Sequence, residues 1–147
     1  IALVGTAVPM PVSDALLTAT REARPKAEGM VNVWSHGPRG ALGGSTVPGM
    51  WLMGASMRLM ERAAPEVLFN DLNACYAYQR GLEAAAAASC PALLVVGSRD
   101  MMTSPRGAPK LAAALQDARI ASIEGSGHAL MAEYPDAVLD ALRGFIA

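Results

Sequence analysis

Two polar side chains that could share a proton follow successive apolar runs in the last third of the chain. Asp100 comes just after the run at 92–97 (ALLVVG), and His128 follows the run at 119–123 in the glycine-rich turn GSGH. If both runs are parallel strands, their carboxyl ends meet at one edge of a sheet, where α/β proteins build their sites. A carboxylate beside an imidazole fixes its tautomer and stabilises its cation. The pair could therefore work as a base and its orienting acid.

The elements that must position this pair form an α/β pattern. Short apolar runs bounded by Gly, Pro or polar residues predict buried parallel strands. They lie at residues 1–5, 92–97 and 119–123. Helical spacing from Pro109 to about Ala118 links the last two into a βαβ unit. Pro135 starts a final helix with an apolar stripe, which we expect to pack on the sheet to the end of the chain.

Between the first two strands the sequence is helical. Ser13 is a candidate cap for a helix to about Arg24, which we expect Pro25 to end. A second helix is predicted between Pro48 and Pro65, where methionines recur at intervals of three, four and three residues, at Met50, Met53, Met57 and Met60. A further helix is predicted from Pro65 through Tyr76, and the alanine-rich stretch before Pro91 leads into the next strand.

The methionine stripe has two compatible interpretations. Residues on one helix face usually pack into a core, whereas flexible thioethers also suit an adaptable apolar pocket. For Trp51 we favour a buried packing role over a pocket role. The candidate pocket residues are Trp51, Met53, Met57 and Met102.

Composition limits the function classes. The chain has 147 residues, is 52% hydrophobic and carries a net charge of −1, which predicts a packed globule and disfavours binding to nucleic acid or anionic membrane surfaces. Two long stretches lack charge, at 41–57 and 84–98. Glycines and Pro48 interrupt the first, and the second is short and interrupted by Pro91, so we expect no membrane span. Cys75 and Cys90 indicate neither a disulfide scaffold nor a metal-ligand cluster. We expect no metal or cofactor, with the cytoplasm as the default location.

The two motifs together resemble the C-terminal half of an α/β-hydrolase. The resemblance rests on CPALLVVGSRDMMTSP, about one βα unit, and then GSGHALMAEYPDAVLDALRGFI. It implies a sheet strand and loop at 1–11, a helical lid at 12–80, and a C-terminal core at 81–147. It also implies that Asp100 and His128 are the acid and base of a Ser–Asp–His triad, in the chain order of that family.

The nucleophile motif of that family, G-x-S-x-G, is missing from the sequence. The serines near glycine are Ser45, Ser56 and Ser126, and none completes it. The resemblance therefore implies a nucleophile about 20 to 25 residues before Ile1, together with oxyanion donors outside the chain. We expect the 147 residues alone to be inactive. The expected partner is the N-terminal half of the same protein, or a second copy, at the open edge of the first strand.

Several activities remain open. An apolar pocket with few polar groups suits a hydrophobic ester, lactone or diketone. An aspartate nucleophile would indicate an epoxide or haloalkane hydrolase, in which Tyr76 and Tyr78 could polarise an epoxide oxygen, and a cofactor-free haloperoxidase would keep serine. The alternative class is a non-catalytic binding module. His36 is favoured as a helix-end residue that contacts terminal carbonyls, outside the catalytic set.

Overall fold

A three-stranded parallel sheet forms the centre of the molecule. The computed structural model describes residues 1–147, with strands β1 (Ala2–Val4), β2 (Ala92–Gly97) and β3 (Ala118–Ile123) in the order β1-β2-β3. Leu3 lies opposite Leu94, and Leu94 opposite Ile120. The three predicted strands and their parallel arrangement are confirmed, but the expected burial holds throughout only for β2: no residue of β1 is buried, and in β3 only Ile123 is.

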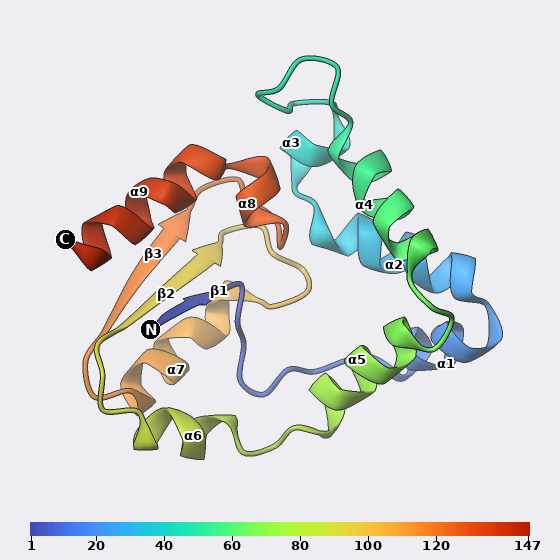
Figure 1. Cartoon of the computed structure of the whole chain (residues 1–147). Helices are drawn as coiled ribbons and strands as arrows, with labels where there is room; N and C mark the ends of the chain where they lie inside the picture. Colours follow the sequence, from blue (N-terminus) through green and yellow to red (C-terminus); the bar gives the residue numbers. More distant parts are fainter.

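Helices cover both faces of this sheet (Figure 1). All six residues of β2 are buried, and the first five alternate between two apolar clusters. Leu94 and Val96 face α6 (Gly81–Ala87) and α7 (Ala108–Ala114). Leu93 and Val95 face α8 (Leu130–Glu133) and α9 (Pro135–Ile146). The predicted final helix is confirmed, since Val138, Leu142 and Phe145 pack on the sheet.

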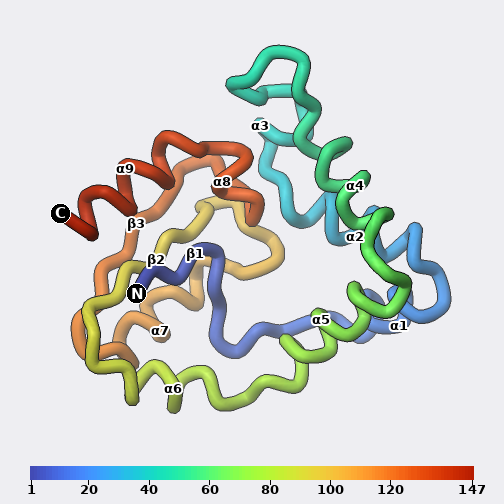
Figure 2. The backbone as a smooth tube through the Cα atoms, viewed as in Figure 1, coloured from blue at the N-terminus to red at the C-terminus, as the bar shows by residue number.

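The remaining helices lie beside the sheet rather than on it. Between β1 and α6 the chain forms five of them: α1 (Asp14–Glu22), α2 (Arg24–Ser35), α3 (Pro38–Ala41), α4 (Leu52–Arg62) and α5 (Val67–Ala77). We call α1–α5 the helical segment. It has its own small core around Leu16, Ala19 and Ala27. The chain leaves the sheet after β1, passes through this segment and returns through α6 to β2 (Figure 2).

The predicted start of α1 is confirmed, but the expected role of Pro25 is wrong. The hydroxyl of Ser13 accepts the N–H of Leu16 at 3.3 Å and caps α1. Pro25 does not simply end this helix, because it lies in the first turn of α2. Proline is tolerated there because the first N–H groups of a helix have no partner within the helix.

The helix predicted between Pro48 and Pro65 is confirmed as α4, but its methionine stripe is not a buried core. Leu52 is the buried residue of α4, whereas Met53, Met57 and Met60 are half-buried. Met50 precedes the helix and is 46% exposed.

The favoured buried role of Trp51 is also wrong, since its side chain is 63% exposed. Its ring lies against the backbone of α4 at Gly54, where a Cβ would come within 2.3 Å of the ring. The indole therefore packs on its own helix, at a position that lacks a side chain, instead of entering a core.

The longest helices of the molecule, α2 and α9, have 12 residues each. None of the helices combines the length and the apolar character that crossing a bilayer requires.

Candidate acid–base site

Two loops that approach each other backbone to backbone bring Asp100 and His128 together. Asp100 follows β2, and His128 follows β3. The two loops touch at Gly97 and Gly127. A Cβ on Gly97 would lie 2.3 Å from the carbonyl oxygen of Gly127, so only a glycine fits at the end of β2. The N–H of Arg99 also donates to the carbonyl of Ser126 at 2.8 Å. The expected meeting of the two strand ends is thus present in the structure.

Asp100 is held by hydrogen bonds at both carboxylate oxygens. Oδ1 accepts the N–H groups of Met102 and Thr103, each at 2.8 Å, and Oδ2 lies 2.9 Å from Nδ1 of His128. The aspartate side chain is 1% exposed and the imidazole 35%. Burial raises the pKa of Asp100, but the hydrogen bonds from His128 and Thr103 lower it more, so that the net pKa lies below its usual value. The carboxylate is therefore ionised at neutral pH.

An ionised Asp100 fixes the tautomer of His128. Because the carboxylate accepts a hydrogen bond, Nδ1 of the imidazole carries the hydrogen that it donates. The hydrogen bonds of His128 all involve Nδ1, which leaves Nε2 without a partner in the chain. Its lone pair is free to accept a proton. This is the arrangement of a general base with its orienting acid.

Thr103 completes the site, and the sequence reasoning missed it. Its hydroxyl lies 2.7 Å from Oδ2 of Asp100, 3.2 Å from Nδ1 of His128 and 2.9 Å from the carbonyl of Gly5. One hydroxyl thus contacts the chain that follows each of the three strands. A threonine three residues after an aspartate in a strand-end turn is a local signal that could have indicated it.

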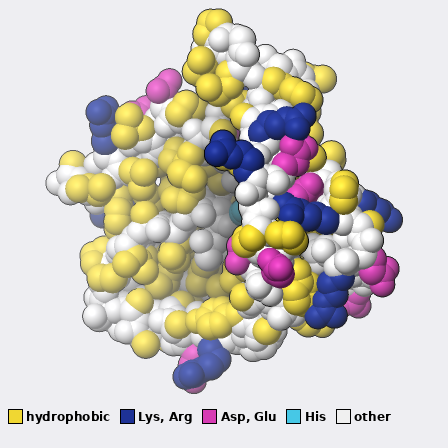
Figure 3. Space-filling model, turned by 45° about the vertical axis from the view of Figure 1, so that its right-hand side comes forward, with side chains coloured by type: hydrophobic (Ala, Val, Ile, Leu, Met, Phe, Trp, Pro, Cys, Tyr) yellow, Lys and Arg dark blue, Asp and Glu magenta, His cyan; other side chains and the backbone are white.

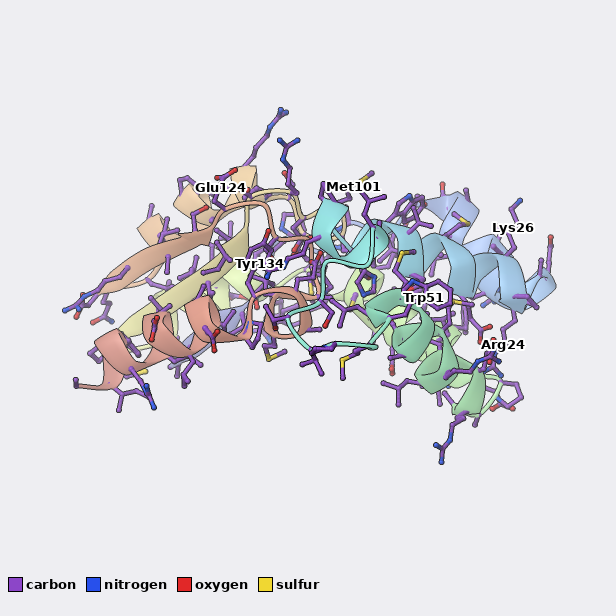
Figure 4. The ribbon with its side chains drawn as sticks, turned by 90° about the horizontal axis from the view of Figure 1, so that it is seen from above. Arg24, Lys26, Trp51, Met101, Glu124 and Tyr134 are labelled. Carbon is purple, nitrogen blue, oxygen red and sulfur yellow. The ribbon has the colours of Figure 1, made fainter.

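The candidate pocket residues do not gather in one place. Met102 lines a hollow of about 200 Å³ together with Leu16, Trp34, Leu72 and Met101, whereas Asp100 lines a different, mostly polar hollow. Trp51 and Met57 border a separate hollow, and Met53 lines none of these. Met101 belongs to the loop after β2, whereas Trp51 directly precedes α4, and Figure 4 shows the two side chains apart. Trp34 was not among the predicted pocket residues.

A recess opens between the sheet and the helical segment, with hydrophobic side chains along its walls (Figure 3). His36 lies at the end of α2, where its Nδ1 is 2.8 Å from the carbonyl oxygen of Asn32. This agrees with the favoured helix-end role: the ring nitrogen contacts Asn32 and neither Asp100 nor His128, although His36 and Asp100 line one hollow. The structure contains no group of three or more His, Cys, Asp or Glu side chains placed to hold a metal ion.

Comparison with known proteins gives a family-level match. The model of a family described as "Alpha/beta hydrolase family" matches residues 2–141. Among the curated proteins, none is similar enough to count as a relative.

Solved structures share the fold at low sequence identity. An esterase from Exiguobacterium antarcticum is 17% identical with a TM-score of 0.79, with 99% of this chain and 56% of the esterase covered. The enol-lactonase from Burkholderia xenovorans LB400 is 19% identical with a TM-score of 0.80, with 99% and 55% covered. A candidate non-heme bromoperoxidase from Mycobacterium tuberculosis H37Rv is 21% identical with a TM-score of 0.68, with 99% and 56% covered. The chain thus spans about half the length of each of these proteins.

Proposed function

Because the chain belongs to the α/β-hydrolase family, we propose that Asp100 and His128 are the acid and the base of a Ser–Asp–His triad. The observation that carries the proposal is the 2.9 Å contact between Nδ1 of His128 and Oδ2 of Asp100, which leaves Nε2 open. The chain is then the C-terminal part of a serine-type hydrolase. Its serine lies outside residues 1–147, which the missing G-x-S-x-G motif and the half-length coverage of the similar structures support.

The reaction is a two-step acyl transfer. The serine hydroxyl attacks the carbonyl carbon of the substrate while Nε2 of His128 takes the hydroxyl proton. His128 then gives this proton to the leaving group, which is the alkoxide of an ester or lactone or the enolate of a diketone. Water attacks the acyl-enzyme with the same imidazole as base, which releases the acid and restores the serine. Asp100 stays ionised throughout and stabilises the imidazolium, a role that its lowered pKa supports.

The substrate is an apolar ester, lactone or C–C diketone. Six of the eight residues that line the hollow at Met101 and Met102, which directly follow Asp100 in the chain, are hydrophobic, whereas the hollow that Asp100 itself lines is mostly polar. Hydrophobic walls suit an apolar acyl or alcohol group, which burial removes from water. Because helices α1, α2 and α5 supply part of the hydrophobic lining, the helical segment is proposed as the lid over the site.

Two readings compete within the same fold. An aspartate nucleophile would make the protein an epoxide or haloalkane hydrolase, and a serine enzyme could also act as a cofactor-free haloperoxidase. The similarity to a candidate non-heme bromoperoxidase supports keeping the haloperoxidase reading. Outside catalysis, the alternative is a binding module in which Asp100 and His128 only stabilise two loops.

The test uses the protein expressed in full from its natural gene. We expect hydrolysis of p-nitrophenyl butyrate with a burst of nitrophenol, and loss of about 10³-fold or more of kcat in His128→Ala and Asp100→Asn. The matched control is Asp140→Asn, because Asp140 is an exposed carboxylate on α9. This control should retain wild-type kinetics.

The nucleophile is identified by covalent labelling. A fluorophosphonate that modifies a serine before residue 1 supports the serine triad. Oxygen-18 from labelled water that appears in an aspartate after one turnover supports the epoxide or haloalkane reading. Unchanged kinetics in His128→Ala, or activity in residues 1–147 alone, would contradict the proposed triad.

A further inference from the structure

Glu133 is a fully buried carboxylate outside the acid–base pair. Its exposed fraction is 0%, although ionised side chains are almost never fully buried without partners. Oε1 accepts the N–H of Gly37 at 2.7 Å and the N–H of Gly40 at 3.3 Å, and Oε2 accepts the N–H of Gly127 at 2.8 Å. Each oxygen therefore binds a different part of the chain.

The two parts that Glu133 joins are the histidine loop (residues 125–129) and the turn from the end of α2 into α3 (residues 35–40). Gly127 immediately precedes His128, whereas Gly37 and Gly40 belong to the helical segment. On the other side of the histidine, the N–H of Ala129 donates to the carbonyl of Ser35 at 2.8 Å. Both neighbours of His128 are thus hydrogen-bonded through this turn, directly or through Glu133.

The contact between these segments leaves no room for adjustment. A Cβ on Gly127 would lie 2.4 Å from the backbone nitrogen of Gly37, so the two backbones touch. The imidazole itself rests on Gly5, where a Cβ would be 3.2 Å from Cε1 of His128. The imidazole now lies over Gly5 and beside Asp100. A shift of the histidine loop would therefore move the ring out of both contacts.

The chemistry of Glu133 requires a carboxylate. Burying a charge is costly unless hydrogen bonds compensate it, and three N–H donors do so here. A glutamine has one acceptor oxygen, so its NH₂ group would face an N–H donor on one of the two sides. Glu133→Gln therefore breaks one link and leaves a buried donor without an acceptor.

We propose that Glu133 is the positioning residue for His128, which fixes the imidazole relative to the helical segment through Gly127 on one side and Gly37 and Gly40 on the other. The proposal rests on the proposed function, in which His128 is the base. It makes the placement of the base depend on the placement of the helical segment over the site.

The first experiment does not require activity. In the protein expressed in full from its natural gene, nitrogen-15 NMR of the imidazoles reports the tautomer of His128 and its hydrogen-bonded Nδ1–H. We expect Glu133→Gln to retain the fold by circular dichroism but to broaden or shift this Nδ1–H signal. The matched control is Glu124→Gln, the same chemical change at an exposed glutamate whose side chain points away from the helical segment (Figure 4).

The second experiment measures ester hydrolysis. Misplacement of the base should lower kcat by about 10- to 100-fold in Glu133→Gln and leave KM within about twofold, because His128 acts in the transition state. Glu133→Asp is the second variant, since it keeps the charge but is one methylene too short to reach both segments. It should show the same changes in smaller measure.

The outcomes separate this proposal from the proposed function. If the wild type has no hydrolase activity, the proposed function fails while the NMR arm still tests the positioning of His128. A lowered Tm with an unchanged His128 signal and unchanged kcat would overturn the positioning role. Failure of both Glu133 variants to fold would also overturn it, because a purely structural role would then suffice.

Discussion

At the scale of single residues, the contact between Asp100 and His128 depends on neighbouring groups that hold both side chains in place. Asp100 is oriented by the backbone N–H groups of Met102 and Thr103, and the Thr103 hydroxyl contacts the shared hydrogen-bond region of Asp100 and His128. The same hydroxyl reaches the carbonyl of Gly5. Thr103 therefore connects the pair to the end of the neighbouring strand, and its removal should affect the imidazole as well as the carboxylate.

Thr103→Val tests this role, because valine keeps the branched shape and removes the hydroxyl. We expect kcat/KM for ester hydrolysis to fall about tenfold, which corresponds to about 1.4 kcal/mol, since a hydrogen bond to a charged group is lost. Thr103→Ser is the control, because it keeps the hydroxyl, and it should stay within about threefold of wild type. A valine variant with wild-type kinetics would show that the hydroxyl is not needed.

The lowered pKa of Asp100 predicts a specific dependence of stability on pH. Burial raises this pKa and the hydrogen bonds from His128 and Thr103 lower it more, so the folded pKa lies below the value in the unfolded chain. Between these two values the unfolded state binds more protons, and stability therefore falls as pH decreases. The contribution of Asp100 is complete above about pH 4 and is lost as pH falls through its folded pKa.

Urea denaturation at about pH 5 and about pH 3.5 measures this contribution. The wild type should lose more of its unfolding free energy between the two pH values than Asp100→Asn, which has no carboxylate to titrate. Asp140→Asn removes an exposed carboxylate and should behave as the wild type does. Equal losses in wild type and Asp100→Asn would contradict the lowered pKa.

Sequence reasoning found the residues whose positions follow from strand ends and missed those whose partners come from distant backbone. Asp100 and His128 could be predicted, because the carboxyl ends of neighbouring parallel strands converge. Glu133 could not, because its three partners are N–H groups of Gly37, Gly40 and Gly127, which only the folded chain brings together. Nothing in the residue type shows that a glutamate will be buried.

At the scale of elements, glycine decides how closely the histidine loop packs. Gly127 has a backbone nitrogen of Gly37 and a carbonyl oxygen of Ser35 within 2.4 and 2.8 Å of where its Cβ would stand. Backbone atoms cannot rotate away as a flexible side chain does. The contact between the loop and the helical segment is therefore closed to any larger residue.

Gly127→Ala should destabilise the protein by about 3 kcal/mol, because overpacking against backbone forces the two segments apart. Gly29→Ala is the matched control, for which we expect a gain in stability. Gly29 lies in the interior of α2 with nothing within 4 Å of its would-be Cβ, so alanine should raise the free energy of unfolding by about 0.5–1 kcal/mol. Urea denaturation measures both changes. A stable Gly127→Ala would show that the loop can shift at little cost.

The elements themselves could be predicted where one physical cue dominated. Continuous apolar runs indicated the three strands, and the stripe after Pro135 indicated α9. The cue was ambiguous at Pro25, since a proline can follow one helix and also open the next. The methionine spacing indicated α4, but spacing alone does not say whether a neighbouring element covers that face.

At the scale of the whole molecule, two packed bodies meet near the candidate site. The sheet with α6–α9 contains two apolar clusters, one on each face of β2, and the helical segment contains a third. Contacts of Glu133 and Ser35 join them beside His128, and the guanidinium of Arg39 adds a cation–π contact 4.7 Å from the centroid of the Tyr134 ring. The site therefore lies at a junction whose geometry both bodies determine.

The outer edge of β1 is the other feature that belongs to this scale. The carbonyl of Ile1 and the N–H of Gly5 bond to β2, and by strand alternation the N–H and C=O groups of Ala2 and Val4 face away from it. In the structure β1 pairs with β2 alone. An unpaired edge of this kind is a template for another strand. In the protein proposed above, that strand comes from the N-terminal half.

The polypeptide 1–147 expressed by itself should therefore self-associate through this edge. Size-exclusion chromatography with light scattering should show a mass that rises with concentration. Ala2→Pro removes one of the outward N–H groups at an exposed position and should shift the population toward monomer. Ala2→Ser keeps the N–H and should associate as the unmodified polypeptide does. A clean monomer at all concentrations would show that the edge is inert, and association unchanged by proline would place the contact on another surface.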